Sequence, residues 1–247
     1  YLLNWVLKPR NKPYTTTLAN IKKTKLRTKK IALITFTFII SFTLFSQQNE
    51  FEKTLGKENV ETLNSLIENF ETKTLKKEYP SLKTENAYKE FLKDILKPNS
   101  IDRRKKFPES KLKLNIYCVS DSTWIEEREL SSGEKSEMIK TKYKCLNQNG
   151  KVIYSSSISY CCKEKSKTLK LVEKQKEDVQ INMIGYYLKA LEGMSNKSKF
   201  VEYYLKNIKI TADPIHTYRM SEYILNNNID LNDYFTKRLI FINMIYR

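Results

Sequence analysis

The sequence predicts an α+β protein with an N-terminal helical hairpin, a central antiparallel β-meander of three or four strands, and a C-terminal helical bundle. Three observations lead to this: apolar residues recur at helical spacing in 57–97, at alternate positions in 112–162, and again at helical spacing in 177–246. Helices precede and follow the strands without alternating with them, so a parallel doubly wound sheet is not expected. The N-terminal hairpin is too small to fold alone, so residues 47–247 are expected to form a single domain.

Two helices are expected in residues 57–97. The first one ends at Tyr79-Pro80, because a residue that precedes proline is disfavoured in the helical conformation. The second one is expected from about Thr84, a possible N-cap, to Leu96. The apolar face of the first helix comprises Val60, Leu63, Ile67 and Phe70, and that of the second comprises Tyr88, Phe91, Leu92 and Ile95.

Residues 98–111 are expected to be a linker between the hairpin and the sheet. The linker carries the basic run 103–106, which in a cytosolic protein would suggest contact with nucleic acid. Because an export signal is also present, we interpret the run as part of a solvated connection.

A β-hairpin is expected around Asn149-Gly150, which separates the alternating runs 138–146 and 151–160. If these two residues form the loop, Cys145 faces Tyr154. The core face would then hold Ile139, Tyr143, Cys145, Val152, Tyr154, Ile158 and Tyr160, and the solvent face Lys142, Lys144, Ser155, Ser157 and Ser159. Further strands are expected over Leu114, Ile116 and Cys118, and over residues 124–130.

Three or four helices are expected after the lysine-rich stretch 163–176. Gly193 ends the first of them, Asp213-Pro214 is a typical helix start, and Asp230 with Asp233 opens the last. Their apolar faces comprise Ile181, Ile184, Leu188 and Leu191; Phe200, Tyr203, Tyr204 and Ile208; and Phe235, Leu239, Ile242 and Tyr246. Residues 239–246 are apolar nearly all round, so deep burial is expected there.

Residues 26–46 have the pattern of a secretory signal peptide. Lys29 and Lys30 precede the uncharged stretch 31–45, and Ser46 is a small residue before a polar boundary. Fifteen helical residues span about 22 Å, less than the roughly 30 Å hydrocarbon core of a bilayer. Export to the periplasm, the cell envelope or the exterior is therefore expected, with only transient membrane contact. The alternatives are an uncleaved membrane anchor formed by residues 31–49 and a buried core helix.

Residues 1–25 fit poorly in front of such a signal. The chain opens on Tyr1, and its first methionine is Met138. We expect translation to start at Leu26, read as Met, so that residues 1–25 are upstream sequence translated by mistake. The alternative is a disordered basic arm on a chain that is a fragment.

The net charge of +17 is unevenly distributed. Residues 1–46 hold nine Lys and Arg and no Asp or Glu, which leaves 36 basic and 28 acidic groups in the rest of the chain. Arginine, whose fork binds phosphates and bases, occurs only eight times. We interpret the charge as a solvated lysine surface and expect no specific nucleic acid partner; an anionic surface ligand is the alternative.

Few residue patterns point to catalysis. The five glycines are too far apart for a phosphate-binding loop, and His216 is the only histidine, expected as an ordinary residue in the first turn of a helix. Carboxylates near Trp124 resemble a glycosidase site only in composition, so we interpret them as surface acids that balance charge. They are Asp121, Glu126, Glu127 and Glu129.

The four cysteines lack the paired spacing of a zinc site. We expect Cys118 and Cys145 to come within disulfide reach if their strands are neighbours, and Cys161 to be unable to pair with Cys145 across the hairpin. No bond is expected between Cys161 and Cys162, which are adjacent. The alternative is that the cysteines are small apolar core residues.

The sequence thus favours an exported, non-enzymatic binding or structural protein with an unidentified partner. One alternative is an exported hydrolase that uses carboxylates on polysaccharide, and another is a lysine-rich anion-binding module that uses residues 163–176. No catalytic, cofactor-binding or metal-ligating residue is assigned, and no cofactor is expected.

Overall fold

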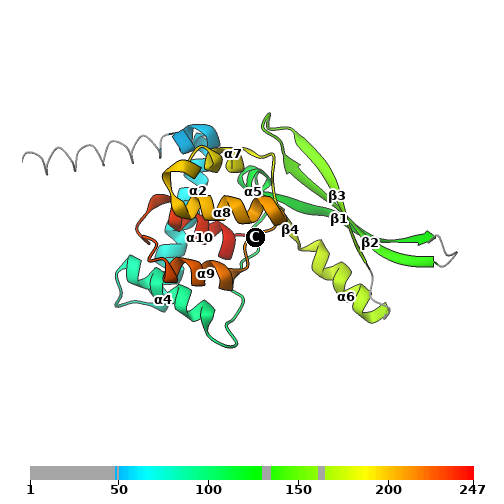
Figure 1. Ribbon diagram of the computed structural model, residues 1–247. Helices are drawn as coiled ribbons and strands as arrows, with labels where there is room; N and C mark the ends of the chain where they lie inside the picture. The colour runs from blue at the N-terminus through cyan, green and yellow to red at the C-terminus, as the bar shows by residue number, and fades with distance from the viewer. Residues whose placement is uncertain (1–47, 49, 130–134, 161–164) are drawn as a thin grey trace, which may run out of the picture. The chain divides into compact units, whose positions relative to one another are not determined.

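A computed structural model of the chain describes residues 48, 50–129, 135–160 and 165–247 (Figure 1). It confirms the predicted α+β class: helices lie at both ends of the described chain, and one four-stranded antiparallel sheet lies between them. The expected basic arm 1–25 and signal peptide 26–46 lie outside the described residues. None of the described helices is long and apolar enough to cross a membrane.

The N-terminal hairpin is confirmed. After the helical residues 50–55 come α2 (Lys57–Phe70), the π-helical turn η1 (Glu71–Leu75), α3 (Lys76–Glu78) and α4 (Thr84–Leu96). The ring of Phe70 contacts the rings of Tyr88 and Phe91 on α4, with centroids 5.9 and 5.4 Å apart. Thr84 is the first helical residue and Lys83 holds the N-cap position, so the interpretation of Thr84 as the cap is wrong by one residue.

The start of the predicted sheet is helical. Residues Lys111–Ile116 form α5, although Leu114 and Ile116 alternate as in a strand. Ser110 caps this helix by accepting a hydrogen bond from the Lys113 N–H (3.1 Å). Residues 112–119 are all buried, so the alternating pattern does not separate a core face from a solvent face here.

The sheet has the strand order β3-β2-β1-β4 and is antiparallel throughout. Its strands are β1 (Tyr117–Glu129), β2 (Lys135–Leu146), β3 (Val152–Tyr160) and β4 (Val179–Ile181). The two strands expected around Cys118 and in residues 124–130 are parts of the single strand β1. A register shift between Ser120 and Ser122 marks a bulge in that strand.

The β2–β3 hairpin forms, but its predicted register is wrong by one residue. The Asn147 N–H donates to the Lys151 carbonyl (3.0 Å), and Gly150 has a φ of 70°, so the loop has three residues rather than two. Cys145 therefore pairs with Ile153, and Lys144 with Tyr154.

A one-residue shift moves each side chain of a strand to the other face. The two sets of β3 side chains are consequently exchanged relative to the prediction. Ser155, Ser157 and Ser159 lie on the face of Tyr143 and Cys145, and Val152, Tyr154, Ile158 and Tyr160 lie on the face of Lys142 and Lys144.

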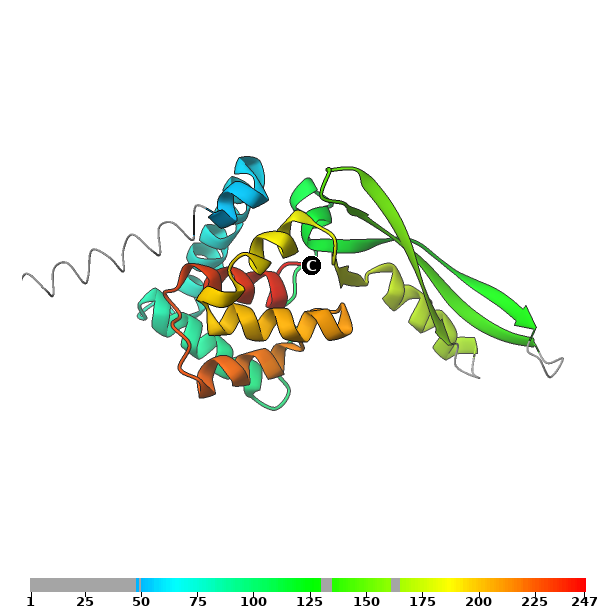
Figure 2. The same cartoon turned by 45° about the horizontal axis from the view of Figure 1, so that its top comes forward.

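The lysine-rich stretch forms α6 (Lys165–Lys176), which packs against β1 and β2 (Figure 2). The hydroxyl of Thr141 on β2 donates to the Gln175 side chain on this helix (2.9 Å). Ile181, expected on a helix, lies on β4. Its N–H donates to the Ala212 carbonyl (2.8 Å), a partner that local spacing does not reveal.

The C-terminal helices are α7 (Tyr186–Glu192), η2 (Ser195–Lys197), α8 (Lys199–Thr211), α9 (Thr217–Asn226) and α10 (Tyr234–Met244). Gly193 follows α7 and Asp233 caps α10, as predicted. The helix start expected at Asp213-Pro214 is wrong, because α9 begins at Thr217. The side chain of Asn243 binds both the N–H and the carbonyl of Ile215 (2.8 and 2.6 Å), which holds that segment out of the helix.

The main hydrophobic core joins the N-terminal hairpin, the C-terminal helices and the first residues of β1. Residues 239–246 are deeply buried within it, as predicted. A second, smaller cluster lies on one face of the sheet. It comprises Cys118, Tyr143 and Cys145, with Ile153 packed against it. Beyond these clusters β1, β2 and β3 extend away from the other helices, with α6 beside them (Figure 1).

Candidate functional site

An open cleft of about 670 Å³ lies where the linker, β1, the end of α6 and the C-terminal residue meet. Basic side chains dominate its lining. Its charged residues are Arg104, Lys105, Lys106, Lys113, Lys174, Lys176 and Arg247, together with Asp102, Glu109, Glu177 and Asp178. The excess of cations makes an anion the ligand that this cleft favours electrostatically.

Backbone hydrogen bonds hold the linker beside the C-terminal segment. The Lys105 N–H donates to the Ile245 carbonyl (2.8 Å), and the Arg247 N–H donates to the Lys105 carbonyl (3.1 Å). The Phe107 N–H then donates to the Arg247 carbonyl (2.6 Å). Two segments far apart in the sequence thereby bring Arg104 and Arg247 to the same cleft.

Arg104 is paired within the linker. Its Nε lies 2.7 Å from each carboxylate oxygen of Asp102, and its Nη2 also contacts Oδ2. This pairing raises the pKa of Arg104 and holds the pKa of Asp102 below its usual value. A ligand at Arg104 would have to share the guanidinium with Asp102.

Arg247 has no such partner. Among the described residues, no carboxylate lies within ion-pair distance of its guanidinium, and its Nε is buried without a hydrogen-bond partner. Burial lowers the pKa of Arg247 and the cation of Arg104 adds to this effect, whereas Tyr117, Asp178 and Asp102 act in the opposite direction without cancelling it. A buried guanidinium nitrogen without a hydrogen-bond acceptor is costly unless an anion binds it, so Arg247 is the group in this cleft that most favours a ligand.

The lysines of the same cleft differ in burial and in their partners. Lys106 bridges the rim to Glu177 (2.9 Å), and Lys174 makes no ion pair within the described chain. Lys113 is buried, and its Nζ donates to the Phe107 carbonyl (2.7 Å). Burial lowers the pKa of Lys113, and the nearby cation of Lys106 adds to this effect.

A second cavity, of about 340 Å³, shares Asp102, Arg104 and Arg247 with the first. His216 lines this smaller cavity. It is exposed and occupies the N-cap position of α9, not the first turn as expected. The guanidinium of Arg247 therefore borders both cavities.

Glu126 and Glu127 of β1 do not form a paired acid site. Glu126 and Glu127 are successive residues of a strand, so their side chains point to opposite faces of the sheet. Lys140 Nζ lies 2.6 Å from Glu126 and, chiefly through this contact, lowers the pKa of Glu126. A glycosidase acid requires a raised pKa, so this geometry does not favour the hydrolase alternative.

The sulfur atoms of Cys118 and Cys145 form a disulfide across β1 and β2, with a Cα–Cα distance of 4.4 Å. The expectation for this pair is confirmed. The expectations for Cys161 and Cys162 fall outside the described residues.

No group of three or more potential metal-ligating side chains occurs in the part of the chain that the structure describes. No protein-family model, no curated protein and no solved structure is significantly similar to this chain. The assignment of the cleft therefore depends on its own geometry and charge.

Sequence reasoning missed this site. The sequence predicts a solvated linker for the basic run 103–106, and no local pattern marks Arg247 as a binding residue. The anion-binding alternative named residues 163–176, of which Lys174 and Lys176 do line the cleft. Arg247 lies in the same cleft as these two lysines because the C-terminal segment is hydrogen-bonded to the linker.

Proposed function

We propose that this chain is an exported, non-enzymatic binding protein that holds an anionic group in the cleft around Arg104 and Arg247. The observation that carries the proposal is the half-buried Arg247 side chain, whose Nε is buried without a hydrogen-bond partner and which has no carboxylate within ion-pair distance among the described residues. A phosphate, sulfate or carboxylate group would supply the missing negative charge and accept hydrogen bonds from the fork of that guanidinium.

The cleft suits an anionic group larger than a single ion. Its volume of about 670 Å³ is within the range of pockets that hold small organic ligands. Lys174 and Lys176 reach the lining from the end of α6, whereas Arg247 reaches it from the C-terminal segment. Two sources of positive charge favour an anion with more than one charged group.

Two observations support export. The Cys118–Cys145 disulfide is of a type that persists in oxidising compartments and is rare in the cytosol. Phe51 and Leu55 are buried in the core, so the packed domain begins only a few residues after the expected cleavage at Ser46. We propose that residues 26–46 act as a signal peptide and that the mature domain works in the periplasm, the cell envelope or outside the cell.

Titration of the full chain with inorganic phosphate, pyrophosphate and a heparin disaccharide tests the anion site. The variant R247Q removes the charge but keeps a polar side chain, and we expect it to weaken binding of the tightest of these probes at least tenfold. K174Q, which changes an exposed side chain of the lining, should weaken binding to a smaller extent while leaving the fold intact.

R219Q is the matched control, because Arg219 is exposed on α9 and lines neither cavity. It should bind like the wild type. The proposed site is wrong if none of the three probes binds, or if R219Q weakens binding as much as R247Q does.

Sequencing of the N-terminus of the natural protein tests the export proposal. We expect the first residue to be Gln47, because cleavage after Ser46 leaves the packed domain complete. A natural protein that retains residues 26–46 would contradict a cleaved signal peptide and favour the membrane anchor.

A further inference from the structure

Among the described residues, the strand β3 forms one edge of the sheet and has β2 as its one partner strand. Edge strands usually carry lysine, proline or a bulge, which prevents them from pairing with another chain. Residues Val152–Tyr160 read VIYSSSISY and contain no charged residue, no proline and no glycine. They pair with β2 over nine consecutive residues without a register shift. This edge is therefore long, regular and unprotected.

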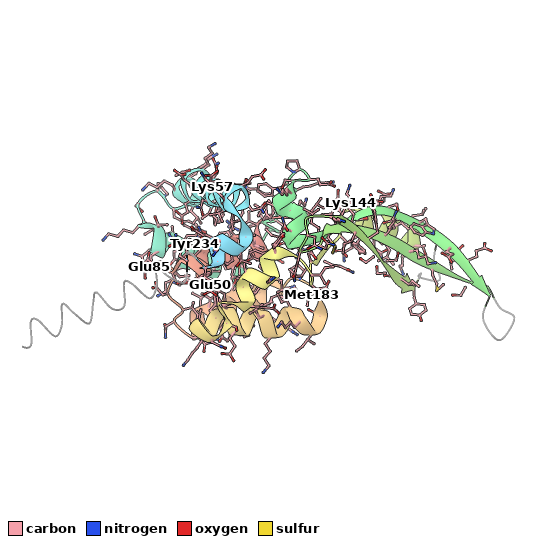
Figure 3. The ribbon with its side chains drawn as sticks, turned by 90° about the horizontal axis from the view of Figure 1, so that it is seen from above. Glu50, Lys57, Glu85, Lys144, Met183 and Tyr234 are labelled. Atoms are coloured by element: carbon pink, nitrogen blue, oxygen red, sulfur yellow. A yellow bond between two sulfur atoms is a disulfide. The ribbon has the colours of Figure 1, made fainter. Side chains whose placement is uncertain are left out.

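Four large apolar side chains lie on one face of this strand and are exposed. Their exposed fractions are 50% for Val152, 55% for Tyr154, 53% for Ile158 and 82% for Tyr160. The same face of β2 carries Lys142, whose Nζ lies 4.0 Å from the ring centroid of Tyr154. Figure 3 labels Lys144, the next lysine on this face, which pairs with Glu109 (2.9 Å). The positive charges of these two lysines are thus partly balanced by contacts within the chain.

The hydrogen-bonding phase of β3 follows from the hairpin loop. The bond from the Asn147 N–H to the Lys151 carbonyl makes these two residues a hydrogen-bonded pair. Such pairs recur at every second residue of an antiparallel ladder, so the odd-numbered residues of β3 bond to β2. The N–H and C=O groups of Val152, Tyr154, Ser156, Ile158 and Tyr160 consequently point to the free edge.

We propose that β3 pairs with β3 of a second copy of this chain, antiparallel and with a two-fold axis at Ser156. This register places Ser156 opposite its own copy, Tyr154 opposite Ile158 and Val152 opposite Tyr160. Each of these positions has outward-pointing backbone groups, so the pairing uses the free groups of both strands in their correct phase. It also covers all nine residues of each strand.

The side chains are complementary in the same register. An aromatic residue faces a β-branched residue at both pairs on the apolar face, a combination that stabilises antiparallel sheets. On the other face Ser155 lies opposite Ser157, so small side chains meet there. A two-fold contact of this kind uses one patch twice, as in most homodimers. The side chains of β3 are therefore complementary to those of a second β3 strand in this register.

A contact between two strand edges buries less surface than most stable dimers, which bury about 1,200–2,000 Å² in total. We therefore expect a dimer that dissociates on dilution. Sedimentation velocity of the full chain, measured across a concentration series, should show a change from the monomer mass of 29.3 kDa to twice that value.

The variant I158K places a charge in the proposed contact at a side chain that is already half exposed, so the monomer should keep its fold. It should sediment as a monomer at concentrations at which the wild type is dimeric. I210K is the matched control, because Ile210 is exposed on α8 and distant from β3 in sequence. A wild type that stays monomeric, an I158K protein that still dimerises, or an equal effect of I210K would overturn the proposal.

Cross-linking tests the register itself. In a background in which Cys161 and Cys162 are replaced by serine, S156C should form an intermolecular disulfide under mild oxidation, because paired Cα atoms at the axis lie about 5.5 Å apart. S155C should link poorly, because Ser155 faces Ser157 rather than its own copy. Equal cross-linking of the two variants, or none, would contradict an axis at Ser156.

Discussion

At the scale of single residues, Asn182 holds the base of the sheet to α5. Its side-chain amide donates to the carbonyls of Leu114 (2.9 Å) and Leu146 (2.7 Å), at the ends of two different elements. Gly185 fits against the same place. A Cβ built at Gly185 would lie 2.3 Å from the Asn115 carbonyl oxygen and 2.6 Å from the Asn182 amide nitrogen. The close approach, and not an unusual φ, requires glycine here.

Replacement of Gly185 by alanine is therefore expected to destabilise the protein by about 2–3 kcal/mol, because backbone and a buried amide must move to admit one methyl group. Gly193→Ala is the control: its Cβ would have no neighbour closer than 3.5 Å, and its backbone is right-handed helical. This change should leave stability unaltered or raise it by up to about 1 kcal/mol. Urea unfolding of both variants measures the difference, and similar midpoints would contradict this account.

Residue patterns could predict the buried faces of the N-terminal hairpin, α8 and α10, since each depends on spacing within one helix. They could not predict Asn182, Gly185 or Arg247. The partners of these residues are carbonyls, amides or charges from remote segments, and no local signal marks them. The candidate site was missed for the same physical reason.

At the scale of elements, Arg103 connects the linker to the N-terminal hairpin through its side-chain contacts. It contacts Glu78, lies with its Nη2 3.8 Å from Asp94, and is 5.1 Å from the ring centroid of Phe91. Asp94, near the end of α4, also accepts hydrogen bonds from Tyr79 (2.5 Å) and from Lys97 (2.6 Å). One carboxylate thus joins α4, the turn after α3 and the linker.

These hydrogen bonds, that of Lys97 first and that of Tyr79 second, hold the pKa of Asp94 below its usual value. A lowered carboxyl pKa stabilises the fold above the unfolded-state pKa of about 4, and this contribution is lost as the pH falls through the folded-state pKa. Asp94→Asn should therefore cost about 1–2 kcal/mol at pH 7 and progressively less as the solution is acidified below pH ~4.

Thermal unfolding of Asp94→Asn and the wild type across a pH series checks this expectation. Glu222→Gln, on the exposed face of α9 and outside its first turn, should show no such pH-dependent difference from the wild type. A deficit for Asp94→Asn that stays constant down to pH 2 would show that the charge of Asp94 does not matter.

Element types were harder to predict where burial or remote pairing overrides the local pattern. Residues 111–116 alternate like a strand yet fold as a helix, and residues 112–116 are all buried, so the alternation does not mark a solvent face. The lysine-rich stretch forms α6 with only Thr168 and Val172 buried, so its sequence carries little helical periodicity. The β2–β3 hairpin was predicted, but one extra loop residue exchanged its faces.

At the scale of the whole molecule, burial is unequal across the described fold. Nine of the eleven residues of α10 are buried, whereas α6 is mostly exposed and packs against β1 and β2. Local opening requires less free energy where fewer apolar contacts are lost. The helical core and the sheet with α6 should therefore differ in local stability.

Hydrogen exchange of the backbone amides of the full chain tests this difference. We expect the amides of α10 to exchange only on global unfolding, and those of α6 to exchange at least tenfold faster. Mass spectrometry of peptides from the two helices gives the rates. Equal protection of α6 and α10 would indicate that the sheet and its helix open only together with the core.

The bond between Cys118 and Cys145 also closes a covalent ring that contains most of β1 and β2. A protease that cuts the main chain once, anywhere between these two cysteines, leaves both products attached to one another. Such nicked protein would migrate as a single species until a reductant is added, and would then separate into two fragments.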